Sequence, residues 1–445
     1  MAYEDKSGAQ PVFDASKDIR LFTILAATNE DSLATLRCSL HYVDRETQPP
    51  YTAISYTWGE GPANTHEVIC NGCPLLVGIN CYTLLCELRR LKLTGHGNLI
   101  WIDALCINQA DVGERNAQVA RMGDTFRSAA KTIVFLRQDI EDAEPVPSDC
   151  VHMSDLASQS DHDFKILVMH SAWYQPGGDH PMESDLLQNI WFGRGDETKD
   201  VRLRMSTLTT NPWFTRTWIV QELMLSREAL LLLESSACLV PWDVVYRMYN
   251  MWSRMSIETP QVVTMHAGWT ATGIDAFVDG VRFANSEDPA QEKATYLRRL
   301  FATLVRTRRF CCSDPRDKLY GILALFKMTH LETLQPDYNK SALTVYSDLS
   351  WSMLESGITD ILALAGLHTD DNWPSWVVDW SIDTRLCRDK LIERPSQYKA
   401  GFVGSRGRLH FSRSDDGRTV LVRGLIVGHV QTCHSCFAKT ETGYV

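Results

Sequence analysis

The stretch that decides the fold is Tyr51-Thr-Ala-Ile-Ser-Tyr-Thr-Trp-Gly59. It is rich in β-branched and aromatic residues, which favour strands, and it ends at a glycine. It therefore predicts a central strand that runs into a tight loop, Gly59-Glu-Gly-Pro62. In open α/β sheets the ligand crevice forms beyond strand ends of this kind, so this loop is the first candidate for a binding site.

Strand and helix patterns alternate on both sides of this stretch. Two short strands are predicted before it, at 20–25 and 36–43. After it come a hairpin at 68–77, a helix at 80–91, a strand at 99–103, a helix that Asp111 caps, and a strand at 131–136. Strand, helix, strand, helix, strand with short connections predicts parallel pairing and right-handed crossovers. The fold class is therefore α/β, with a parallel sheet flanked by helices.

The rest of the chain is less regular. Residues 139–200 lack periodicity and are interpreted as a long insertion, and the apolar run at 230–233 predicts a further strand. Beyond it, helical patterns dominate to about 380, and alternating β-hairpin strands follow. The predicted organisation is an N-terminal segment 1–50, an α/β domain 51–235, a mainly helical extension 236–380 and a β-rich segment 381–445.

The stretch Asn211-Pro-Trp-Phe-Thr-Arg-Thr-Trp-Ile-Val-Gln-Glu-Leu223 opens like a helix. Asn211 can cap it with its side chain, and a proline suits the first turn. Trp218 and Glu222 are four residues apart, so they share one helical face. An aromatic wall partly desolvates a carboxylate and raises its pKa. The alternative is an amphipathic helix with core tryptophans and one surface glutamate.

Composition narrows the function classes. The 445 residues carry a net charge of −11, which argues against a general binder of nucleic acid or anionic membrane. The polar start is unlike a signal peptide, and no apolar run approaches a membrane span. The 13 cysteines indicate reduced thiols in a cytoplasmic protein. Isolated pairs such as Cys70 and Cys73 are weak evidence for zinc, so no metal site is predicted.

Three motifs, taken in order, resemble those of fungal heterokaryon-incompatibility (HET) domains. They are Ala53-Ile-Ser-Tyr-Thr-Trp-Gly59, then Trp101-Ile-Asp-Ala-Leu-Cys-Ile-Asn-Gln109 with Glu114-Arg115 and Gln118, and finally Trp213-Phe-Thr-Arg-Thr-Trp-Ile-Val-Gln-Glu-Leu223. The likeness extends over about 50–430. It implies an effector of programmed cell death in fungal non-self recognition, a form of innate immunity. It also implies self-association or an unidentified protein partner.

The order of the elements is also similar to that of Toll/interleukin-receptor (TIR) domains, which are flavodoxin-like. Ile54-Ser-Tyr56 matches their first strand, Ile102-Asp103 the end of their second, and Trp218-Ile-Val-Gln-Glu-Leu223 their tryptophan-cysteine-x-x-glutamate-leucine helix. Here Ile219 stands in place of the cysteine. In catalytic TIR domains the glutamate drives NAD hydrolysis, so the resemblance implies Glu222 as the catalytic residue and NAD as a substrate, with no cofactor.

Such chemistry suits a single carboxylate. Nicotinamide in NAD is already cationic and leaves as a neutral molecule, so one carboxylate that stabilises the oxocarbenium-like ribose can suffice. The predicted substrate-binding residues are Tyr56, Trp58, Gly59, Asp103, Asn108, Arg216 and Trp218. For most of them a structural role is an equal or stronger alternative: Tyr56 and Trp58 as core residues, and Asn108 as a loop brace. The opposing hypothesis is a non-catalytic death-signalling module in which Glu222 is structural.

Overall fold

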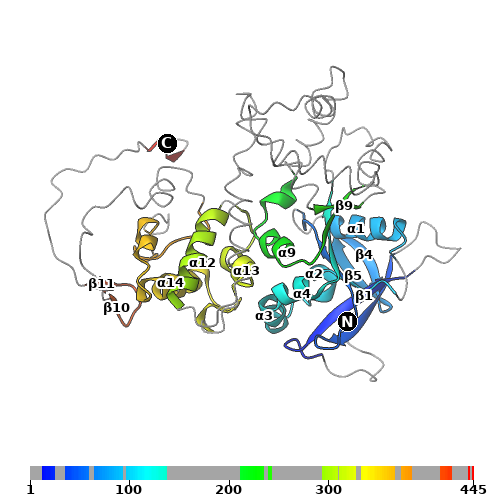
Figure 1. Ribbon diagram of the computed structural model, residues 1–445, viewed down its shortest axis with the longest axis horizontal. Coiled ribbons are helices and arrows are strands. Elements are labelled where there is room, and N and C mark those ends of the chain that lie inside the picture. The colour runs from blue at the N-terminus through cyan, green and yellow to red at the C-terminus, as the bar shows by residue number, and fades with distance from the viewer. Residues whose placement is uncertain are drawn as a thin grey trace, which may run out of the picture. The chain divides into compact units, whose positions relative to one another are not determined.

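The structure is a computed structural model, and it divides the chain into two compact units, Met1–Val278 and Asp279–Val445 (Figure 1). The residues that it describes are 13–25, 36–59, 65–93, 97–137, 211–234, 239–242, 293–308, 310–326, 332–365, 372–382, 411–422, 439–440 and 443–444. The predicted insertion at 139–200 and the hairpin strand predicted at 425–430 lie outside these residues.

The first unit is built on a nine-stranded mixed sheet in the order β5-β4-β2-β1-β6-β3-β7-β8-β9. The strands are β1 Asp18–Ile24, β2 Arg37–Asp44, β3 Thr52–Ser55, β4 Thr65–Cys70, β5 Cys73–Gly78, β6 Ile100–Trp101, β7 Lys131–Leu136, β8 Ala229–Leu233 and β9 Leu239–Pro241. The helices are α1 Ile79–Arg90, α2 Asp103–Cys106, α3 Val112–Ala120, α4 Met122–Ser128, the 3-10 turn η2 Pro212–Thr215, and α9 Ile219–Met224. The α/β class predicted from the sequence is confirmed.

The four central strands β6, β3, β7 and β8 are parallel to one another, whereas β1 and β9 pair with the outer two in antiparallel fashion. In chain order β3 is the first of them, β6 the second, β7 the third and β8 the fourth, so their spatial order is 2-1-3-4. The chain leaves β3 toward one side and returns to the other side as β7. Flavodoxin-like sheets have this order, and their ligands bind beyond the carboxyl ends of the strands at that reversal. A ligand site is therefore expected beyond the carboxyl ends of β3 and β7.

The hairpin of β4 and β5 follows the prediction closely. Its two-residue turn is Asn71-Gly72, with φ angles of 51° and 77°. Both are positive, as a type I′ turn requires. The Asn71 side chain also accepts a hydrogen bond from the backbone N–H of Leu40 at 2.9 Å, which ties the turn to β2. Local turn chemistry thus sets the register at this edge of the sheet.

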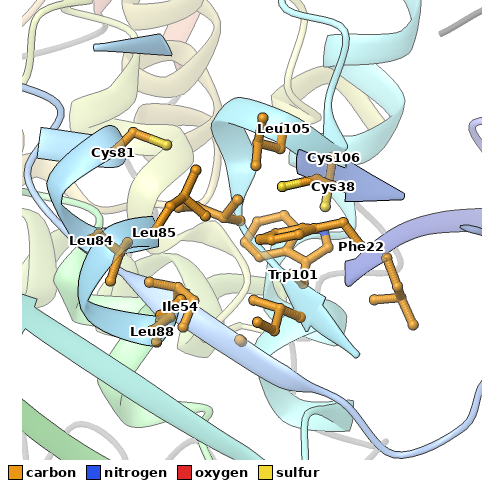
Figure 2. Close-up of a cluster of buried hydrophobic side chains, with 14 of the residues drawn as sticks. Phe22, Cys38, Ile54, Cys81, Leu84, Leu85, Leu88, Trp101, Leu105 and Cys106 are labelled. Atoms are coloured by element: carbon orange, nitrogen blue, oxygen red, sulfur yellow. The ribbon is translucent and has the colours of Figure 1, made fainter. Parts of the chain in front are cut away.

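The main core lies between α1 and the strands β1, β3 and β6 (Figure 2). Helix α1 contributes Cys81, Leu84, Leu85 and Leu88, which lie at helical spacing on one face. They gather around Phe22, Ile54 and Trp101, which are at most 2% exposed (Figure 2). Burying side chains of this size stabilises the fold by about 1.5–3 kcal/mol each.

A second apolar cluster lies on the other side of β7. Successive side chains of a strand point to opposite faces. Ile133 and Phe135 belong to the main core, whereas Val134 and Leu136 pack with Trp213, Phe214 and Ile219 of the η2–α9 segment. Helix α1 and the η2–α9 segment therefore cover opposite faces of the sheet. Ser55, which follows Ile54 in β3, lies on the α9 side.

Two polar residues of the second motif brace the sheet from α3. Glu114 accepts hydrogen bonds from both terminal nitrogens of Arg20 on β1 and from the backbone N–H of Asn108. Gln118 accepts from Arg45, just beyond β2, at 2.8 Å. Asp111 caps α3 as predicted, because its side chain accepts a hydrogen bond from the Glu114 N–H. The Glu114 side chain binds Arg20 and does not return a hydrogen bond to the backbone N–H of Asp111, as it would in a capping box. The predicted single helix is interrupted near residue 121, where α3 ends and α4 begins.

The second unit contains the helices α12 Lys293–Thr307, α13 Asp317–Leu323 and α14 Ala342–Glu355, the 3-10 turns η3 Glu332–Leu334 and η4 Thr359–Ala363, and the strand pairs β10 Phe411–Arg413 with β11 Val420–Val422 and β12 Lys439–Thr440 with β13 Gly443–Tyr444. Among the described residues, no helix combines the length and the apolar character that crossing a membrane requires.

Arg316 connects the loops of the second unit. Its guanidinium binds the carboxylate of Asp314 and the backbone carbonyls of Tyr338 and Lys340. The Tyr338 hydroxyl in turn donates to Asp317 at 2.7 Å. Helix α13 begins at Asp317, and Asp314 accepts a hydrogen bond from the Arg316 N–H and forms a turn ahead of the helix. These contacts hold the loops of the second unit together.

Candidate functional site

The segment that carries Glu222 is two short pieces rather than one helix. Asn211 accepts a hydrogen bond from the Trp213 N–H, so the predicted cap forms, but it caps the 3-10 turn η2. Arg216 then has an extended backbone, and α9 starts at Ile219. The Glu222 N–H still donates a hydrogen bond to the Trp218 carbonyl at 3.2 Å, so the helical backbone hydrogen bond between these two residues forms.

The Glu222 carboxylate is anchored to the end of β3. Its Oε2 accepts a hydrogen bond from the Ser55 hydroxyl, and the Ser55 Oγ accepts from the indole Nε1 of Trp213 at 2.7 Å. An indole N–H can only donate, so the serine hydrogen is free to point at the carboxylate. Glu222 is 2% exposed and Ser55 is 1% exposed. This chain of donors orients an acidic group at the carboxyl end of a parallel strand.

Arg216 covers the same carboxylate. Its Nη1 and Nη2 lie 3.4 and 3.5 Å from the two oxygens of Glu222. Tight charge-assisted bonds are about 2.7–2.9 Å long, so this pair is loose. The Arg216 side chain is 16% exposed against 3% for Glu222, so the guanidinium forms the outer layer.

Asp103 supplies a second carboxylate, at the start of α2 just beyond β6. It accepts from the Trp58 indole at 2.8 Å and from the Ala104 N–H at 2.7 Å. Burial and the negative charge of Glu222 raise the pKa of Asp103 to about 6, although Arg216 acts in the opposite direction. Because both Glu222 and Arg216 act on Asp103, the ends of β3 and β6 and helix α9 contribute to one electrostatic cluster. We call Ser55, Asp103, Arg216 and Glu222 the acidic cluster.

Polar side chains also link the ends of β3 and β7. Asn80 of α1 donates to the Thr57 carbonyl at 2.8 Å and accepts from Arg137, which follows β7, at 2.5 Å. Asn211 donates to the Arg137 carbonyl at 2.7 Å. Gly59 has a φ of +89°, and a Cβ there would lie 3.1 Å from Asn80 Nδ2. The loop after β3 is therefore held against α1 at a position that only glycine suits.

The other predicted substrate-binding residues lie partly in the core and partly at the surface. Tyr56 is 3% exposed, and its hydroxyl bonds the Cys81 thiol within the core, where burial raises its pKa well above the usual value. Trp58 is 46% exposed and lies beside Asp103. Asn108 accepts from the Ala110 N–H and bonds Glu114 through its own N–H, so its contacts brace the loop. Trp218 packs, partly buried, against the main core.

Ser55, Asn80, Arg137 and Trp213 are the site residues that the sequence patterns missed. Ser55 lies inside the first motif and Trp213 inside the third, but a serine in a strand and a tryptophan near a cap carry no local sign of a shared hydrogen bond. Among the described residues, no group of three or more His, Cys, Asp or Glu side chains is arranged to hold a metal ion.

The fold and the cluster together define an α/β protein with a buried and a partly buried acidic group at the carboxyl edge of its central strands. The family described as "Heterokaryon incompatibility protein (HET)" matches residues 51–222, which begin just before β3 and end on Glu222. Residues 51–222 thus match the HET domain. It is also 23% identical over 419 residues to "Heterokaryon incompatibility protein 6, OR allele" of Neurospora crassa.

That alignment covers 83% of this chain and 58% of the relative, so the chain spans little more than half of the relative's length. No solved structure matches the chain.

Proposed function

We propose that this protein acts in heterokaryon incompatibility as an effector of programmed cell death, and that it does so by hydrolysing NAD to nicotinamide and ADP-ribose at the acidic cluster. The family match and the relative's name support the biological role. The observation that carries the enzymatic part is the position of Glu222, which Ser55 orients at the reversal point of the sheet beside Arg216 and Asp103.

Arg216 explains how a covered carboxylate becomes available. Its pairing with Glu222 is loose, and a guanidinium binds phosphate oxygens bidentately with high affinity. The diphosphate of NAD draws Arg216 away from Glu222, which then faces the ribose. Trp58, 46% exposed, offers a flat surface for one of the rings.

Hydrolysis of NAD then requires only one stabilising carboxylate from the protein. The bond between ribose C1′ and the nicotinamide nitrogen breaks, and its electron pair neutralises the pyridinium. Glu222 stabilises the positive charge that develops on the ribose. Water adds its oxygen to C1′ and releases one proton, which gives ADP-ribose. Exclusion of water around Glu222 strengthens this electrostatic effect.

The decisive experiment measures NAD consumption by the full chain and by Glu222→Gln, at high protein concentration and after enforced oligomerisation. Glutamine keeps the size and an acceptor for Ser55, so a normal circular dichroism spectrum and melting temperature are expected. The rate should fall about 10²–10³-fold, as when a transition-state stabiliser is removed. Glu87→Gln is the matched control, because Glu87 pairs with Arg90 on α1 and lies outside the acidic cluster, and it should retain the wild-type rate.

Equal turnover by the wild type and Glu222→Gln would eliminate the catalytic role of Glu222. Absence of turnover even in the enforced oligomer would favour the second candidate, a death-signalling module that binds a partner. The burial and pairing of Glu222 are the observations that favour this second candidate. Expression of both forms in a fungal host separates the two further, because only an enzyme should lose its toxicity with Glu222→Gln.

A further inference from the structure

The acidic cluster holds two carboxylates in contrasting surroundings. Glu222 accepts hydrogen bonds from the Ser55 hydroxyl and from the Arg216 guanidinium, so one of its two partners is charged. Asp103 receives only the neutral donors of Trp58 and Ala104 and lies nearer to the surface, where its side chain is partly exposed. Two carboxylates with unequal surroundings make up the usual acid and base pair of glycoside hydrolysis, and Asp103 is the one that can retain a proton.

We infer that Asp103 acts as a general acid opposite Glu222, so that the site also hydrolyses ribonucleotides whose base must be protonated to leave, such as purine nucleoside 5′-monophosphates. This inference rests on the proposed function, because it uses the same Glu222. NAD needs no such acid, since its base already carries a positive charge. A second carboxylate at this position is therefore unexplained by NAD hydrolysis alone.

The chemistry balances without a further reactant. The bond from C1′ to N9 of the purine breaks, and its electron pair passes to the base. Asp103 gives its proton to the base, which leaves neutral, while Glu222 stabilises the ribose cation. Water adds to C1′, and its surplus proton restores Asp103. Arg216 can bind the 5′-phosphate as it would bind the diphosphate of NAD.

The surroundings of Asp103 support a proton held near neutral pH. Burial is the largest physical cause and raises the pKa of Asp103 to about 6, and the negative charge of Glu222 acts in the same direction. The charged and titratable groups that act on Asp103 or respond to it are Arg216, Glu222, Tyr56, Cys81 and Cys106. Of these, only Arg216 favours the ionised carboxylate through its positive charge.

The test compares guanosine 5′-monophosphate with 7-methylguanosine 5′-monophosphate. The two share their sugar and phosphate, but the methylated base is cationic and can leave without an acid. Release of base by the full chain and by Asp103→Asn is followed by liquid chromatography, with NAD as the third substrate. General acids contribute about 10²–10⁴-fold. We expect the rate ratio of unmethylated to methylated substrate to fall at least about 30-fold in Asp103→Asn.

The wild-type pH profile gives a second readout that does not depend on a variant. Asp103 must hold its proton to act, so release of guanine should decline above pH about 6, while release of 7-methylguanine should not follow the same decline.

Each outcome bears on a different claim. Cleavage of NAD without cleavage of guanosine monophosphate overturns this inference and leaves the proposed function standing. An equal loss for both guanosine substrates in Asp103→Asn shows that Asp103 is no acid. If none of the three substrates is cleaved, the proposed hydrolase and the inference both fail.

Discussion

Asp103 makes the stability of this protein depend on pH in an unusual direction. Its pKa rises from the ordinary 3.8 to about 6, chiefly because the carboxyl is buried. Between these two values the unfolded chain has lost the proton, whereas the folded protein retains it. The folded state therefore binds more protons, and the free energy of unfolding falls as pH rises through this window. Most paired carboxylates act with the opposite sign.

The magnitude follows from the difference between the two pKa values. At about 1.36 kcal/mol per pH unit, the interval from 3.8 to about 6 corresponds to about 3 kcal/mol of stability lost between pH below 4 and pH 7. Asp103→Asn removes the titrating group. Relative to the wild type, the free energy of unfolding of the variant should therefore rise by about 3 kcal/mol over the same pH range. One weakened hydrogen bond to Trp58 or Ala104 lowers the stability of the variant by a constant amount at every pH.

Urea unfolding of the wild type and Asp103→Asn, followed by circular dichroism from pH 4 to 7.5, measures this difference. Comparing the two proteins at each pH cancels the titration of every other group. Trp58→Phe is a useful companion, because it removes a hydrogen bond that lowers the pKa of Asp103 and should shift the window to higher pH. If the difference in stability between the two proteins changes by less than about 1 kcal/mol across this pH range, the conclusion that burial raises the pKa of Asp103 is refuted.

Two further predictions concern the support of the site. Glu114→Ala removes the carboxylate that balances the buried guanidinium of Arg20, so urea unfolding should show a loss of about 3–5 kcal/mol. Glu87→Ala, which breaks a more exposed pair, should cost less than about 1 kcal/mol, and similar losses would contradict this reasoning. Gly59→Ala, at a φ of +89°, should cost about 1–3 kcal/mol in thermal unfolding. Gly97→Ala, where a Cβ meets nothing within 4 Å, should change stability by under about 0.5 kcal/mol, and equal effects would argue against strain at Gly59.

The elements that local chemistry controls could be predicted from the sequence. The strand within 51–59 follows from β-branched residues that end at a glycine, and the hairpin from the Asn71-Gly72 turn. The strands at 131–136 and 230–233 follow from short apolar runs, and the parallel pairing of 131–136 with the strand within 51–59 is as expected. Each of these patterns is contained in fewer than a dozen residues, so no distant partner was needed to recognise it.

The parts that depend on distant partners could not be predicted. Nothing in the sequence near β1 indicates that it pairs with β6 on one side and β2 on the other. The break at Arg216 is equally hidden, because the residues around it are compatible with a continuous helix. Ser55 and Glu222 are 167 residues apart, and only the packing of α9 on the sheet brings them together. The sequence therefore indicates individual residues and motifs of the candidate site, but not the contacts between them.

The charge balance of the acidic cluster limits what can bind there. Glu222 and Asp103 share one arginine, Arg216, so the cluster would carry a net negative charge if both carboxylates were ionised. Burial makes that state costly, and it can be relieved by a proton on Asp103 or by a cation. An anionic phosphate that draws Arg216 outward makes the imbalance greater, so phosphate binding and positive charge at the carboxylates should reinforce each other. A molecule with a phosphate at one end and a cationic or protonatable base at the other satisfies both requirements, and a ribonucleotide has this arrangement.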